Sequence, residues 1–158
     1  MKKLLLFFLL LSTNLQAQEV YDAALDNATR IVNSPTSGDT QTRIAQFKRT
    51  VLVYMRRKAF ERTDSVPARF LDTQAYYLSD FITLFFNEIL NTEEQSKRER
   101  KQKIAIFMNA SLLNPLFGDE DKETTRSYMM EDECITPFCL DTDWQKAFVA
   151  AKKALEND

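Results

Sequence analysis

Apolar residues recur at steps of three, four and seven along the middle of the chain, which is the spacing of one face of an α-helix. They are Phe70, Leu71, Leu78, Phe81, Ile82, Phe85 and Ile89. Further apolar residues widen this face, so that only a narrow polar stripe remains. A helix of this kind must be covered by neighbours on most sides. The pattern therefore predicts a central helix over residues 72–91, which begins at Asp72 or already at Pro67.

The same period predicts further helices on both sides of the central one, separated by short stretches rich in Ser, Thr, Pro, Gly and Asp. They run roughly over Glu19–Asn33, from Asp39 or Thr40 to Arg62, from Gln95 to Asn114, through Arg126, Tyr128 and Met129, and from Asp141 or Thr142 to Leu155. We therefore expect an all-α fold, a single-domain bundle of five to six mostly antiparallel helices over residues 18–158.

Two helix starts carry local signals. Thr92 with Gln95, and Thr142 with Gln145, have the spacing of a capping box. A basic run, Lys97–Lys103, follows the first of them. Its cations have acidic neighbours at i,i+4, which favours a solvated helix start over a binding patch. These pairs are Glu93 with Lys97, Glu94 with Arg98, and Glu99 with Lys103.

The N-terminus has the pattern of a secretory signal peptide. Two lysines precede an unbroken apolar run, Leu4–Leu11, and a polar stretch then leads to Ala17. The run is too short to cross a membrane, which takes about 20 apolar residues, and no later segment is long enough. We predict a signal peptide over residues 1–17, and an exported protein in the periplasm or at the cell surface.

Composition excludes several chemistries. The chain has no histidine, which removes the commonest general base and the commonest metal ligand. It has only two glycines, so there is no Gly-rich phosphate loop. A net charge of −2 argues against nucleic acid as the main partner. The spacing of Asp119, Asp121 and Glu123 resembles a calcium loop, but Thr124 and Met130 stand where that loop needs Gly and Glu. We expect no cofactor, no metal and no enzymatic activity.

The two cysteines, Cys134 and Cys139, are the most specific chemical feature. In an exported protein an even number of cysteines indicates a disulfide, and this pair would close a small ring containing Pro137. Such a ring stabilises a fold by about 2 kcal/mol in the chain-entropy model. Two buried thiols are the alternative. Redox catalysis is disfavoured, because a redox pair is usually Cys-x-x-Cys at a helix start.

The loop that contains this ring, residues 135–143, is the predicted binding surface together with the adjacent tryptophan. A ring-constrained loop beside an aromatic side chain is ordered before a partner arrives, which lowers the cost of binding. The candidate binding residues are Pro137, Phe138, Asp141, Asp143 and Trp144. Asp141 and Asp143 are also the candidate carboxylates of a glycan hydrolase, which needs two such groups about 5 to 10 Å apart. Helix capping explains both aspartates without a substrate.

Two stretches, Asn114–Asp121 and Ile135–Ala147, with Tyr128 between them, resemble the C-terminal part of small exported helical proteins of unknown function from Bacteroides-type bacteria. The end of the signal, at Ala17, is similar as well. This resemblance implies an all-helical fold and a location in the cell envelope. It implies no activity and no site residues.

These observations indicate a non-enzymatic exported interaction or binding module of the cell envelope. Its partner would be another envelope protein or a surface ligand. The alternatives are a carboxylate-dependent hydrolase that acts on envelope glycans, and an inhibitor of an envelope enzyme. The sequence indicates neither the ligand nor the oligomeric state.

Export is directly testable. Because a small residue at Ala17 precedes a polar one, N-terminal sequencing of protein from the envelope fraction should begin at Gln18 or within a few residues of it. Recovery of chains that begin at Met1 from the soluble cytoplasm would contradict this prediction.

Overall fold

The computed structural model describes residues 19–62, 66–89, 95–118, 126–131 and 134–157. In this part of the chain five helices and one two-stranded antiparallel hairpin follow one another. They are α2 (Glu19–Val32), α3 (Asp39–Arg62), α4 (Ala68–Ile89), α5 (Lys97–Leu112), β1 (Arg126–Glu131), β2 (Cys134–Cys139) and α6 (Trp144–Leu155). The predicted all-α class is confirmed, with a small hairpin added to the helical bundle. No helix in the described ranges is long and apolar enough to cross a membrane.

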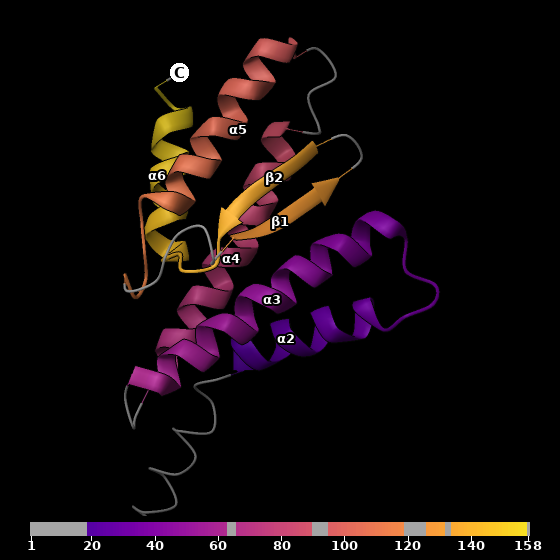
Figure 1. Cartoon of the computed structure of the whole chain (residues 1–158), viewed down its shortest axis with the longest axis vertical. Coiled ribbons are helices and arrows are strands. Elements are labelled where there is room, and N and C mark those ends of the chain that lie inside the picture. Colours follow the sequence, from indigo (N-terminus) through magenta and orange to yellow (C-terminus); the bar gives the residue numbers. More distant parts are fainter. Residues whose placement is uncertain (1–18, 63–65, 90–94, 119–125, 132–133, 158) are drawn as a thin grey trace, which may run out of the picture.

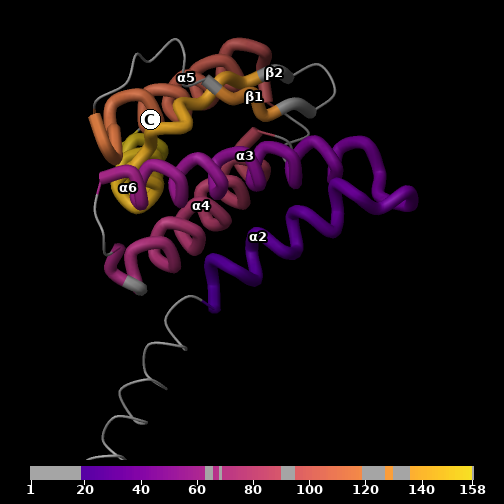
Figure 2. The backbone as a smooth tube through the Cα atoms, turned by 60° about the horizontal axis from the view of Figure 1, so that its bottom comes forward, coloured from indigo at the N-terminus to yellow at the C-terminus, as the bar shows by residue number. Residues whose placement is uncertain are grey.

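Helix α4 lies in the middle of the molecule and contacts all four other described helices. The α2–α3 pair covers one side of it and the α5–α6 pair covers the other (Figure 1). The hairpin bridges the two pairs, because β1 contacts α3 while β2 contacts α5. Figure 2 shows α4 passing beneath α3 in the turned view. The predicted central helix is thus confirmed.

Helix α4 begins at Ala68, directly after Pro67, and continues without a break to Ile89. Proline suits a position just before or within a first turn, where its missing N–H is not needed. The backbone amide of Phe70 donates to the carbonyl of Pro67 at 2.9 Å, which closes this first turn. The choice left open by the sequence is settled in favour of the earlier start. Its buried face carries Leu71, Ala75, Leu78, Phe81, Ile82, Phe85 and Ile89.

Aromatic rings from five elements meet in the core. Phe81 of α4 stands within 5.3 to 5.6 Å, between ring centroids, of Phe107 of α5, Phe138 of β2 and Trp144 of α6. Phe47 of α3 joins them through Phe138, at 5.6 Å. The pairs are tilted or edge-to-face, the geometry that the ring quadrupole favours. The cluster therefore joins both helix pairs and the hairpin to α4.

Tyr21 attaches α2 to its neighbours. Its phenolic hydroxyl donates to the carbonyl of Leu52 on α3 at 2.8 Å, and its backbone amide donates to Asp72 Oδ1 on α4 at 2.9 Å. The ring is fully buried, and this burial raises the pKa of Tyr21 to about 12 although Arg56 acts in the opposite direction. Because the hydroxyl stays neutral at ordinary pH, it remains a hydrogen-bond donor to α3.

The hairpin corrects two predictions. The short helix expected through Arg126 and Met129 is strand β1, and the loop expected over Cys134–Cys139 is strand β2. The strands pair in register, with Tyr128 opposite Pro137. Thr136 and Phe138 of β2 are buried, which is the alternation of a half-buried strand. Strands this short, one of them containing proline, give too weak a pattern to be recognised against a helical background.

The helix starts also differ in detail from the prediction. Helix α5 is capped by Ser96, whose hydroxyl accepts from the amide of Glu99 while the Glu99 carboxylate accepts from the amide of Ser96. This is a capping box, but not the predicted one; Thr92, Glu93 and Glu94 lie outside the described residues. Lys103 forms its ion pair with Glu88 of α4, at 2.7 Å, rather than with the predicted Glu99.

Because Phe81 of the central helix packs against rings from three other elements, it should contribute strongly to the free energy of unfolding. Phe81 is fully buried and contacts three other rings, so Phe81→Ala should lower the free energy of unfolding by about 3 to 5 kcal/mol. The exposed Phe60 of α3 is a matched control, and Phe60→Ala should change it by about 0.5 kcal/mol or less. Chemical denaturation measures both. Equal effects of the two substitutions would show that the core lies elsewhere.

Candidate functional site

Two of the predicted binding residues are core residues. Phe138 is 1% exposed and Trp144 is 0% exposed, and both belong to the ring cluster. The indole Nε1–H of Trp144 has no hydrogen-bond partner among the described residues, so packing alone holds this side chain. A partner cannot reach either ring in this conformation. The predicted recognition loop is instead a strand and a turn that build the interior, and Pro137 is half-buried on that strand.

Asp141 organises the turn that follows α5. Its carboxylate Oδ1 accepts from the amide of Phe117 at 2.7 Å and Oδ2 accepts from the amide of Gly118 at 2.8 Å. Gly118 has φ +76°, a backbone conformation that side chains disfavour, so glycine suits this position. The guanidinium of Arg62 lies 5.2 Å from the centre of the Phe117 ring and links the same turn to α3. Asp141 is thus a structural clamp between chain segments.

Asp143 is the N-cap of α6, where the sequence predicted Asp141 or Thr142. Its Oδ1 accepts from the amide of Lys146 at 3.2 Å and from Gln74 Nε2 of α4 at 3.1 Å. The Gln74 side chain also accepts from the amide of Trp144 at 2.7 Å, which ties α4 to the start of α6. Burial alone would raise the pKa of Asp143, but the hydrogen bonds from Lys146 and Gln74 outweigh it and the pKa is lowered.

A closed ring of hydrogen bonds lies beside the two aspartates. The amide of Cys139 donates to Ser111 Oγ at 2.9 Å, and Thr142 Oγ1 donates to the carbonyl of Cys139 at 2.6 Å. The proton of Thr142 is thereby used, so the 2.8 Å contact between the two hydroxyls has Ser111 as the donor. All three residues are buried. This ring satisfies polar groups that would otherwise be costly inside the core.

These contacts leave little for catalysis. Both aspartates are nearly buried and accept hydrogen bonds from the protein itself. A lowered pKa keeps Asp143 ionised, which is the wrong direction for a general acid at neutral pH. In the described part of the chain no group of three metal-binding side chains comes together. The acidic residues of the possible calcium loop lie outside the described residues.

The predicted disulfide conflicts with the strand. Cys134 and Cys139 are the first and last residues of β2, a strand of six residues. An extended strand places the Cα atoms of such ends about 16 Å apart, at roughly 3.3 Å per residue. A disulfide needs a Cα separation of at most about 7 Å. The ring therefore cannot close within this hairpin, and the sequence-based pairing is wrong for this fold.

Sequence reasoning missed the outward face of α3. Val53 and Phe60 are 50% and 53% exposed, and they are seven residues apart, so they lie on the same face about 10 Å from each other. Arg49 and Arg57 lie along the same face. Arg57 forms a long contact of 3.7 Å with Glu61 and lies 5.7 Å from the centre of the Tyr54 ring. We call Arg49, Val53, Arg57 and Phe60 the α3 face.

A groove runs beside this face, between α3 and the end of the hairpin. Its volume is about 350 Å³, and Leu140, the residue after β2, is part of its lining. Its lining combines an aliphatic floor with two guanidinium groups; the residues are Gln46, Arg49, Thr50, Val53, Tyr54, Arg57 and Leu140. In the sequence this groove is marked only by two apolar residues of α3. Hydrophobic periodicity alone would assign such residues to the core, whereas the structure leaves them on the outer side of the helix.

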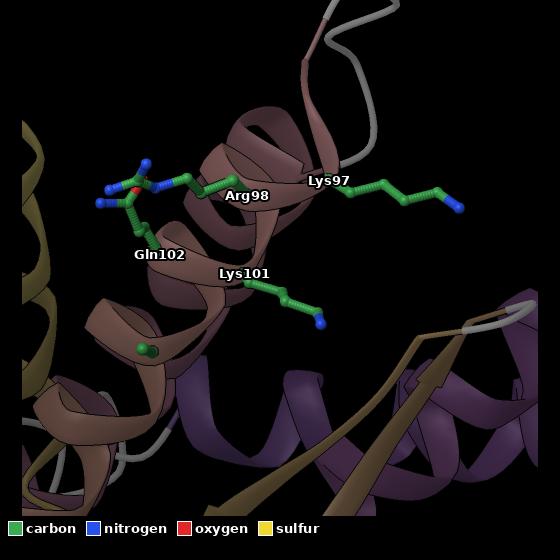
Figure 3. A pocket seen from close by; sticks show the side chains of 5 residues that line it. Lys97, Arg98, Lys101 and Gln102 are labelled. Atoms are coloured by element: carbon green, nitrogen blue, oxygen red, sulfur yellow. The ribbon is translucent and has the colours of Figure 1, made fainter.

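A second exposed surface lies on the first turns of α5. Lys97 and Lys101 project to one side of the helix, while Arg98 and Gln102 project to the other (Figure 3). Together with Ala105 they line an open groove. Lys97, Arg98 and Lys101 form no ion pair with a carboxylate among the described residues. This is the basic run that the sequence assigned to a solvated helix start.

Comparison of the chain with family models, with curated proteins and with solved structures found no match.

Asp143 allows a test of its structural role. Asp143→Ala removes the cap of α6 and leaves Gln74 without its partner, which should cost about 2 kcal/mol at pH 7. Asp143→Asn keeps an oxygen that can accept from the amide of Lys146, so it should lower the free energy of unfolding by less than Asp143→Ala does. Since the folded pKa of Asp143 is lowered, the stabilising effect of the charge is complete above the unfolded value near 4 and is lost as the pH falls from there through the lower folded value.

Thermal unfolding of the wild type and both variants between pH 2 and 7 measures this effect. The gap between the wild type and Asp143→Asn should shrink toward low pH. A gap that stays constant over this range would contradict a stabilising role for the charge.

Proposed function

We propose that this protein is a non-enzymatic interaction module of the cell envelope that binds a protein partner through the α3 face. The observation that carries the proposal is the pairing of two half-exposed apolar side chains, Val53 and Phe60, with arginines on the same helix face. Exposed apolar groups bordered by polar ones are typical of interaction surfaces. Arginine is enriched in such surfaces and binds carboxylates in a fixed geometry.

The chemistry of the face indicates the partner. Arg49 forms no ion pair with a described carboxylate, so its charge is available to an acidic group. A helix or strand that carries an apolar residue for the groove and carboxylates beside it would complement Val53 and Arg49 together. We therefore propose an acidic, amphipathic segment of another envelope protein, which includes the possibility that this partner is an enzyme inhibited by the contact.

A glycan hydrolase has weaker support. Its candidate carboxylates, Asp141 and Asp143, hold the turn after α5 and the start of α6, and both are nearly buried. No specific contact favours a substrate at these groups. Location in the envelope rests on the signal-peptide pattern of residues 1–17, which lie outside the described residues, and on the resemblance to exported helical proteins.

Site-specific photocrosslinking in intact envelopes tests the α3 face. A photoreactive amino acid in place of Val53 should give a discrete adduct, while the same residue in place of Val149, which is 56% exposed on α6, should not. Arg49→Glu and Phe60→Ser should each reduce the adduct at least fivefold. Both positions are at the surface, so the free energy of unfolding should change by about 0.5 kcal/mol or less.

Mass spectrometry of the adduct identifies the crosslinked segment, and an acidic segment is expected. Indistinguishable adducts from positions 53 and 149, or an adduct insensitive to Arg49→Glu, would contradict the proposal.

A further inference from the structure

The first turns of α5 carry positive charges that the dipole of the helix does not favour. Lys97, Arg98, Arg100 and Lys101 stand within the first five residues of α5. The N-terminus of a helix is the positive end of its dipole, so cations there are unfavourable and anions are favourable. The one acidic residue of the first turn, Glu99, is held in the capping box with Ser96. The dipole of the helix therefore does not favour this run of cations, and Glu93 and Glu94, the acidic partners expected from the sequence for Lys97 and Arg98, lie outside the described residues.

Other cations gather at the same end of the molecule. The last turn of α6 carries Lys152 and Lys153, and Figure 1 shows the end of α6 beside the first half of α5. Lys152 lines a groove of about 320 Å³ together with Lys103, which is paired with Glu88 of α4. Glu156 lines the same groove. We call the cations of the first two turns of α5 and the last turn of α6 the basic pole.

We propose that the basic pole docks onto an anionic, phosphate-bearing lipid surface. The protein as a whole has a net charge of −2, so a concentration of cations at one end makes it electrostatically polar. Such a molecule is oriented by a negatively charged surface, which attracts the pole and repels the remainder. Each lysine or arginine near an anionic bilayer adds a modest, additive attraction that salt screens.

The arrangement suits a flat surface better than a nucleic acid. The cations come from the ends of two antiparallel helices, and Figure 3 shows Arg98 on the side of α5 that faces α6 and Lys97 and Lys101 on the other side, so they surround the end of the helix and do not line one groove. Nucleic-acid binding usually goes with a strongly basic domain, whereas this chain has a pI of about 5.3. The lipid surface is the partner that export would supply, so the proposal rests on the predicted export but not on the α3 face.

Vesicle sedimentation with the exported, processed protein tests the proposal. The protein should bind vesicles of phosphatidylcholine containing 30% phosphatidylglycerol in about 20 mM salt, bind pure phosphatidylcholine at least tenfold more weakly, and be released at about 0.5 M salt. Lys97→Glu with Lys101→Glu should reduce the partition coefficient at least tenfold. The matched control is Arg30→Glu with Arg43→Glu on α2 and α3, which changes the net charge equally and should change binding less than twofold.

The charge reversal also separates binding from folding. Acidic residues suit the N-terminus of α5, so the Lys97→Glu, Lys101→Glu variant should melt at the same temperature as the wild type or higher. Lost binding in a protein of equal or greater thermal stability would support a binding role for the lysines. Lys97→Gln with Lys101→Gln should give an intermediate partition coefficient.

Several outcomes would overturn the proposal. These are equal binding to neutral vesicles, no binding to anionic vesicles at low salt, and an equal loss in the control variant. Tighter binding to a single-stranded oligonucleotide or to polyglutamate than to the vesicles would assign the pole to a different partner. None of these results depends on the α3 face, because photocrosslinking at Val53 is scored separately.

Discussion

The edge-to-face packing of Phe81 against three other rings is the interaction on which the arrangement of this molecule depends. Those rings come from α5, β2 and α6, so one side chain of the central helix contacts three separate elements. Phe47 brings α3 into the same cluster through Phe138. Phe85, one turn further along α4, adds contacts to Phe107 and Phe138 at 5.2 and 5.6 Å between ring centroids. Without the cluster, the short hairpin would lose the contacts that fix Phe138 in the interior, and isolated two-stranded hairpins are only marginally stable.

A polar junction complements this apolar centre. Between the end of β2 and the start of α6, Asp141, Thr142 and Asp143 reach three different segments: the turn after α5, Ser111 of α5, and Gln74 of α4. Each contact satisfies a group that packing has removed from water, which is why so many polar residues can be tolerated there. The junction uses the carboxylates that a hydrolase would need. The side chains that remain accessible to a partner lie on the outer faces of the molecule: apolar and cationic ones on α3, and cationic ones on α5.

The two surfaces differ in physical character, which makes them separable. The α3 face combines a groove with half-exposed apolar side chains, so desolvation would contribute to the binding that we propose there, and salt should weaken that binding only partly. The basic pole is exposed charge alone, and its attraction falls steeply with ionic strength. They lie on different sides of α4, so one molecule could hold a protein partner while resting on a lipid surface. A module with both would localise its partner at the membrane.

The amino-acid sequence by itself determined the helical class and the central helix with its buried face, because a 3.6-residue period over 12 to 24 residues is a strong local signal. It also determined the export pattern and the absence of histidine chemistry. Only the tertiary structure decided the rest. Residues 126–131 and 134–139 became paired strands because α3 and α5 provide surfaces for them, and neither surface is visible in the local pattern. The extended strand separates Cys134 from Cys139. Phe138 and Trp144, predicted as binding residues, lie in the core, and Asp143 is the N-cap of α6. Val53, Phe60 and Lys97 are candidate contacts because they are exposed in the described structure. A sequence gives the spacing of residues along a helix, but the neighbouring elements decide which face of the helix is covered.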